Sequence, residues 1–172
     1  MNLGQKFLET LHTVRRTENL PDADRDNGYV VEAEMDSMRV TAELQDFDKF
    51  SCIVKTLAVR RAQAPPANVE LKELLRRQAA ECERSISYLL ENFRLVEMDE
   101  ANYLAQVRSA VPHQKREEKF YYEILLQYGL GATFVRYRKA LRNESRELVP
   151  CHLTHEMLER LVDDLSATLR LN

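Results

Sequence analysis

The 172-residue sequence contains no tryptophan, only four glycines, five prolines and three cysteines. The scarcity of glycine and proline argues against long disordered linkers. The cysteines are widely spaced and form no CxxC pair, which favours free thiols in a reducing compartment over a disulfide framework. No run approaches the roughly 18 apolar residues of a membrane span, and no apolar signal-peptide core precedes the first charges. These absences predict a cytoplasmic protein without a membrane partner.

Short catalytic motifs are also missing. The sequence has no GxSxG nucleophile elbow, no GxxxxGK[ST] phosphate loop and no GxGxxG fingerprint. Metal-ligand residue types cluster only in CHLTH, with Cys151, His152 and His155, and a closed zinc site needs four ligands. We therefore expect no cofactor, no metal site and no assignable catalytic residue. Because active sites assemble from distant segments, the missing motifs favour a non-enzymatic protein without excluding catalysis.

The composition is that of an ordinary globular protein, with 44% hydrophobic residues, 31% charged residues and a net charge of −3. A chain of this length buries roughly 70% of its unfolded surface, so it needs no disulfide or metal for stability. The charge balance does not mark a nucleic-acid binder. We expect one domain over residues 1–172, whose halves, residues 28–93 and 94–172, would share one core.

Three segments place apolar residues at the spacing of an amphipathic helix: residues 3–14, 71–93 and 158–169. The middle segment is the longest, and Asn68 is expected to cap its amino end. Thr154 is expected to cap the last helix in the same way.

Between these segments the apolar period changes to two, which is typical of strands. Tight turns are expected at Asp36-Ser37 and in YGLG, residues 128–131. The order predicts an α+β fold of the form α-βββ-α-βββ-α, with an antiparallel sheet of about six strands and one helix-covered face. In both halves a basic-ended strand runs through Pro66 or Pro150 into a leucine-striped helix. A duplication with two pseudo-repeated halves is therefore one hypothesis.

This order of elements resembles the layout of the small dimeric chaperones of type III secretion. The resemblance is one of layout and not of motif. It implies a non-enzymatic protein-binding, chaperone-like or adaptor-like module, forming a homodimer or holding a protein segment on an exposed surface. This is the main function that we expect.

The basic strand ATFVRYRKALRN, residues 132–143, suggests an alternative. Strand alternation places Arg136 and Arg138 on one face and Lys139 on the other. Two neighbouring arginines can bind phosphate or carboxylate oxygens in a forked geometry. Aromatic residues beside this strand could stack bases, namely Phe120, Tyr121, Tyr122 and Tyr128. The alternative function is thus binding of nucleic acid or another polyanion. The simpler interpretation is a solvated sheet face with cross-strand ion pairs, for example to Glu123.

The segment VEAEM suggests a second alternative. Alternation places Glu32 and Glu34 on the same face of a strand, a geometry that can hold Mg²⁺ or act in acid-base chemistry. VEAEM resembles a truncated ExExK signature of the triphosphate-tunnel enzymes, with Met35 or Asp36 where the lysine is needed. The resemblance implies a phosphate-ligand enzyme in which these carboxylates face Arg136 and Arg138 across a cleft.

Overall fold

The computed structural model describes the chain except for residues 17–27, 90, 111–112, 116, 143–144 and 171–172. The described residues form three helices and a ten-stranded sheet. The helices are α1 (Leu3–Arg16), α2 (Leu71–Ser85) and α3 (His155–Leu169). The strands are β1 (Tyr29–Met35), β2 (Met38–Phe47), β3 (Ser51–Arg61), β4 (Phe93–Asp99), β5 (Leu104–Ser109), β6 (His113–Lys115), β7 (Glu118–Gln127), β8 (Gly131–Ala140), β9 (Arg146–Val149) and β10 (Cys151–Thr154).

The predicted α+β class with an antiparallel sheet is confirmed. The main strand order is β1-β2-β3-β8-β7-β5-β4, and β10, β6 and β9 pair with β3, β7 and β8 respectively. The predicted number of about six strands is too low. Strands β6, β9 and β10 are only three or four residues long, and a period of two is not recognisable over so few positions.

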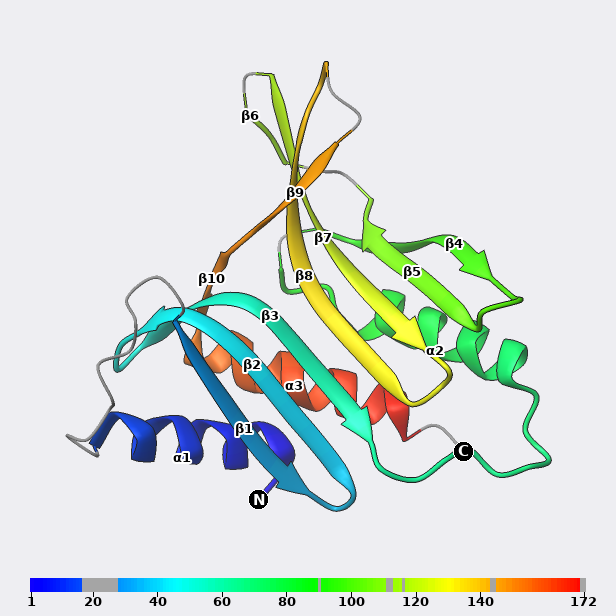
Figure 1. The fold of residues 1–172 in the computed structure, drawn as a ribbon, viewed down its shortest axis with the longest axis horizontal. Helices are drawn as coiled ribbons and strands as arrows, with labels where there is room; N and C mark the ends of the chain where they lie inside the picture. The colour runs from blue at the N-terminus through cyan, green and yellow to red at the C-terminus, as the bar shows by residue number, and fades with distance from the viewer. Residues whose placement is uncertain (17–27, 90, 111–112, 116, 143–144, 171–172) are drawn as a thin grey trace.

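One row of cross-strand partners defines the two faces of the sheet. Neighbours across six strands are successively Val31, Ala42, Leu57, Phe134, Ile124 and Val107. None of these side chains is more than 2% exposed, because α1, α2 and α3 all cover this inner face (Figure 1). The opposite, outer face carries no helix in the described part of the chain. The buried residues of both predicted halves belong to one hydrophobic cluster.

Helices α1 and α3 lie in close contact at Gly4. The Gly4 amide donates a hydrogen bond to Asp163 Oδ1 at 2.9 Å, and a Cβ atom added to Gly4 would clash with the Glu159 carbonyl oxygen. The close contact between α1 and α3 lets the two helices pack side by side beneath β1 to β3 (Figure 1). Among the described residues, no helix is long and apolar enough to cross a membrane.

The middle helix is shorter than its apolar stripe predicts. It ends at Ser85, and buried Ile86 and Leu89 follow in an irregular segment before Phe93 begins β4. Apolar residues keep a helix-like spacing there because this segment continues to bury side chains in the same core. The predicted cap at Asn68 is also wrong, since the N-cap position is Glu70 and makes no side-chain capping bond.

The other predicted cap and both turns are confirmed. Thr154 Oγ1 accepts a hydrogen bond from the Met157 amide at 3.2 Å. Asp36 and Ser37 have positive φ angles of 50° and 65° and connect β1 to β2. Gly129, with a φ of 68°, lies in the turn that joins β7 to β8.

A narrow extension of the sheet projects beyond the helical layer (Figure 1). We call it the arm, and it comprises β6, β9, residues 118–123 of β7 and residues 135–140 of β8. Past Phe134, β8 leaves β3 and pairs with β9 instead. The connection from β8 to α3 thus contains two short strands, whereas the described connection from β3 to α2 contains none. The proposed duplication stays a prediction.

Candidate functional site

Arg136 and Arg138 share the inner face of the arm, as alternation predicts, but both are engaged there. The Arg136 guanidinium lies 5.1 Å from the ring centre of Phe120 and 5.5 Å from that of Tyr122. Arg138 forms ion pairs with Glu147 and, at 3.7 Å, with Glu118. The two arginines therefore do not form an open fork for an anion.

Tyr122 lies between this arginine and the core. Its ring stacks on Phe134 with the centroids 5.4 Å apart, and burial raises the pKa of its hydroxyl group. Its position next to Arg136 is as the sequence predicts, but its ring faces are occupied by protein groups.

The structure does not bring Glu32 and Glu34 to these arginines. Both carboxylates are exposed on the outer face of β1, where Glu34 pairs with Arg39 at 3.0 Å and Glu32 accepts a hydrogen bond from Thr41 at 2.9 Å. Arg136 lies on the inner face, and β2 and β3 separate its strand from β1. The cleft that the triphosphate-tunnel resemblance implies has no counterpart in this arrangement.

Glu123 does not pair with Arg136 or Arg138 either. Its cross-strand partner is Val135, so it lies on the outer face, opposite to the arginine pair. Its Oε2 atom accepts hydrogen bonds from Arg108 Nε at 2.6 Å and from Arg146 Nη1 at 2.7 Å. The Glu123 side chain is only 4% exposed. A buried carboxylate thus fixes two cations at the base of the arm.

Basic residues from three strands are cross-strand neighbours farther out on this face, and the guanidinium of Arg146 reaches back from there to Glu123 and Tyr137. Lys119 lies directly opposite Lys139, whose partner on β9 is Arg146. We call these three residues the cation row. One step closer to the domain, Tyr121 lies opposite Tyr137, and we call these two the tyrosine row. Their ring centroids are 5.8 Å apart.

Arg146 is the member of the cation row that has an acidic partner among the described residues, namely Glu123. Lys119 and Lys139 form no ion pair with any residue that the structure describes. Burial by itself lowers the pKa of Arg146, but hydrogen bonds to Tyr121 and Glu123 outweigh this and raise the pKa overall. The guanidinium lies 4.0 Å from the ring centre of Tyr137. Arg146 therefore stays positively charged at neutral pH.

No protein-family model, curated protein or solved structure matches this chain.

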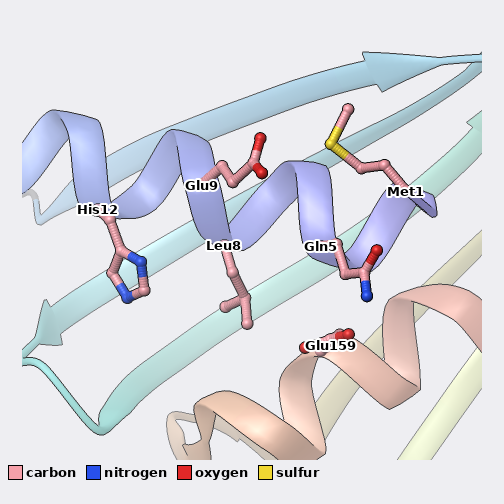
Figure 2. A pocket seen from close by; sticks show the side chains of 6 residues that line it. All are labelled: Met1, Gln5, Leu8, Glu9, His12 and Glu159. Atoms are coloured by element: carbon pink, nitrogen blue, oxygen red, sulfur yellow. The ribbon is translucent and has the colours of Figure 1, made fainter.

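A shallow cavity of about 370 Å³ lies apart from the arm, along α1. It is lined by Met1, Gln5, Leu8, Glu9, His12 and Glu159 (Figure 2). Leu8 and Gln5 extend from α1 on the side of α3, whereas Glu9 and Met1 extend in other directions. The polar groups do not converge on one point, so the cavity gives no catalytic arrangement.

The residues of CHLTH do not converge either. Residues 151–154 form β10, in which Cys151 is buried and His152 points the other way to bond Ser51 at 2.9 Å. His155 begins α3 directly after the Thr154 cap, so the helix start expected at this segment is confirmed at its last residue. Burial raises the pKa of the Cys52, Cys82 and Cys151 thiols to about 12, so these thiols are not activated nucleophiles.

Arg108, Lys119 and Arg146 were not among the residues predicted from the sequence, and Tyr121 was only one of four aromatic residues predicted to lie beside the basic strand. A usable signal was present for two of them. Once the turn after Gln127 sets the register of β7 and β8, strand alternation places Lys119 and Tyr121 beside Lys139 and Tyr137. Nothing comparable in the sequence indicates that β5 and β9 add Arg108 and Arg146.

Proposed function

We propose that this protein is a non-enzymatic binding module that holds a polyanionic partner on the outer face of its arm. One observation carries the proposal: Lys119 and Lys139 are direct cross-strand partners and have no acidic partner among the described residues. Like charges at directly opposite positions destabilise a sheet. A bound anion would relieve this repulsion.

The distribution of charge along the sequence supports a basic arm, although Arg136 and Arg138 lie on its inner face. The chain has a net charge of −3, yet residues 101–146 contain nine Lys or Arg and only four Asp or Glu. On the outer face, the basic arm lies at a distance from Glu32 and Glu34 on the opposite edge strand β1. This asymmetry would orient an anionic chain along the arm.

The proposal is tested with the variant Lys119→Gln/Lys139→Gln. Its binding to fluorescein-labelled inorganic polyphosphate is measured by fluorescence anisotropy over a range of salt concentrations. The matched control is Lys6→Gln/Lys49→Gln, which removes the same charge away from the arm. We expect the arm variant to bind several-fold more weakly and with a shallower salt dependence, and the control to bind like the wild type.

Two results would contradict the proposal. One is absence of wild-type binding at low salt. The other is an equal loss of polyphosphate affinity in the arm variant and the control, which would show that binding depends only on the net charge of the chain.

Protein binding is a second candidate function, supported by the edge of the sheet at β4. Leu95 and Val96 are 37% and 50% exposed on this terminal strand, and an exposed apolar edge can pair with a strand of a second chain. A homodimer or a bound protein segment would then cover β4. Light scattering of the wild type should detect a dimer that Val96→Lys dissociates, and a monomer at every concentration tested argues against self-association.

A further inference from the structure

We infer that the anion bound by the arm is a single-stranded nucleic acid, whose phosphates contact Lys119 and Lys139 while its bases stack against the tyrosine row. This inference rests on the proposed function and adds the chemical class of the partner. The observation behind it is that the cations and the aromatic rings occupy successive positions on one face of the same strands.

The tyrosine row is a layered assembly of rings and guanidinium groups. The rings of Tyr121 and Tyr137 are tilted by 37° to each other. Arg108 lies 5.4 Å from the ring centre of Tyr121, and Arg146 lies 4.0 Å from that of Tyr137. Nucleobases stack both on aromatic rings and on guanidinium planes. A guanidinium group thus covers one side of each ring, and a base can stack only on the ring or guanidinium surface that this assembly leaves open.

The spacing of the two rows suits a nucleotide. Lys119 and Tyr121, like Lys139 and Tyr137, are two residues apart on their strands, which corresponds to roughly 6.6 Å along the sheet. Neighbouring strands lie about 4.8 Å apart. A phosphate held between the two lysines would thus bring its own base close to the tyrosine row.

The buried ion pairs keep this surface in place. Both arginines of the layered assembly donate to Glu123 Oε2, and Gln106 accepts a further hydrogen bond from Arg108 at 2.8 Å. Because the carboxylate is buried, the guanidinium groups are fixed before a ligand arrives. A surface fixed in advance loses less conformational entropy on binding.

Other polyanions use only part of this surface. Polyphosphate and acidic peptides supply negative charge for the lysines but no planar groups for the tyrosine row. In a duplex the bases are paired and stacked inside the helix, so they cannot stack on the tyrosine row. The arrangement therefore favours a single strand over these alternatives.

The test compares three probes of similar length: fluorescein-labelled oligothymidylate, a DNA duplex and inorganic polyphosphate. Each is titrated with the wild type, with Tyr121→Leu/Tyr137→Leu and with Tyr121→Phe/Tyr137→Phe. We expect the leucine variant to lose about tenfold or more in affinity for oligothymidylate and to bind polyphosphate within about twofold of the wild type. The phenylalanine variant keeps the rings and should retain most of the oligothymidylate affinity.

The outcomes separate this inference from the proposed function. Equal losses for oligothymidylate and polyphosphate, or tighter binding of the duplex, would refute base stacking and leave polyanion binding intact. Absence of binding to all three probes would refute both. Ultraviolet cross-linking of the wild type to a bromouridine-containing oligonucleotide gives a readout that does not depend on the folding of a variant. Cross-links are expected within β7 or β8, and cross-links found only elsewhere would overturn the inference.

Discussion

Arg108 Nε lies 2.6 Å from Glu123 Oε2 on the outer face of the sheet, and this pair links the stability of the arm to the charge of its binding surface. Glu123 is the acidic residue that the cations at the base of the arm share. Its carboxylate neutralises part of the surface that we propose for a polyanion. Stability and affinity should therefore respond in opposite directions when this charge is removed.

The variant Glu123→Gln is expected to be less stable and to bind polyanions more tightly. Loss of the carboxylate leaves Arg108 and Arg146 without their partner, which should cost about 1–3 kcal/mol because both guanidinium groups are partly exposed. Removing a nearby negative charge should increase affinity about fivefold, or about 1 kcal/mol. Urea unfolding and fluorescence anisotropy measure the two effects.

The matched control for this variant is Glu147→Gln. It makes the same charge change on the inner face, where Glu147 pairs with Arg138 at an exposed site. We expect little loss of stability and a smaller gain in affinity. Equal gains for both variants would show that affinity depends on net charge alone.

The contact between α1 and α3 should be sensitive to a single methyl group at Gly4. The Cβ atom of Gly4→Ala would meet the backbone of α3 at the Glu159 carbonyl oxygen, so one helix must shift at a cost of about 1–3 kcal/mol. In Gly131→Ala the nearest atom is the flexible end of Arg60 at 3.4 Å, and we expect a much smaller change. Thermal unfolding followed by circular dichroism compares the two variants.

The turn between β1 and β2 can be made more stable. Ser37 has a φ of 65°, a left-handed conformation that glycine adopts without the strain of a Cβ atom. We expect Ser37→Gly to raise the free energy of unfolding by about 0.5–1 kcal/mol. Ser37→Ala keeps the Cβ atom and should give no gain, so equal stabilisation by both substitutions would disprove the explanation.

Asp163 should make the stability depend on pH. Burial, together with the charge of Asp164, raises the pKa of Asp163 above the ordinary value of 3.8. The folded state therefore holds this proton more tightly than the unfolded state, and the resulting stabilisation is lost as the pH rises from 3.8 through the folded pKa. The variant Asp163→Asn should gain stability relative to the wild type over that range.

Urea unfolding at a series of pH values measures this difference. The asparagine oxygen can still accept the hydrogen bond from the Gly4 amide, so the comparison isolates the charge. A constant difference between variant and wild type across the pH range would contradict the assignment.

Helix periodicity, the helix cap and the tight turns could be predicted from the sequence because each depends only on the geometry of a short stretch of chain. The apolar stripes of α1 and α3, the Thr154 cap and the turns at Asp36-Ser37 and Gly129 depend on residues close together in the sequence. Short strands and the end of α2 were not predictable in this way. Three or four residues carry no recognisable period, and a buried irregular segment after Ser85 keeps the apolar spacing of a helix.

That Arg136 and Arg138 share one face of a strand and Lys139 lies on the other can be predicted from the sequence, because alternate side chains of a strand point in opposite directions. Which of these faces is available depends on the tertiary structure. Pairing with β9 brings Glu147 to Arg138 and Arg146 to Glu123, and pairing with β5 adds Arg108. Strand pairing depends on the burial of the whole inner face, so no local pattern specifies these neighbours.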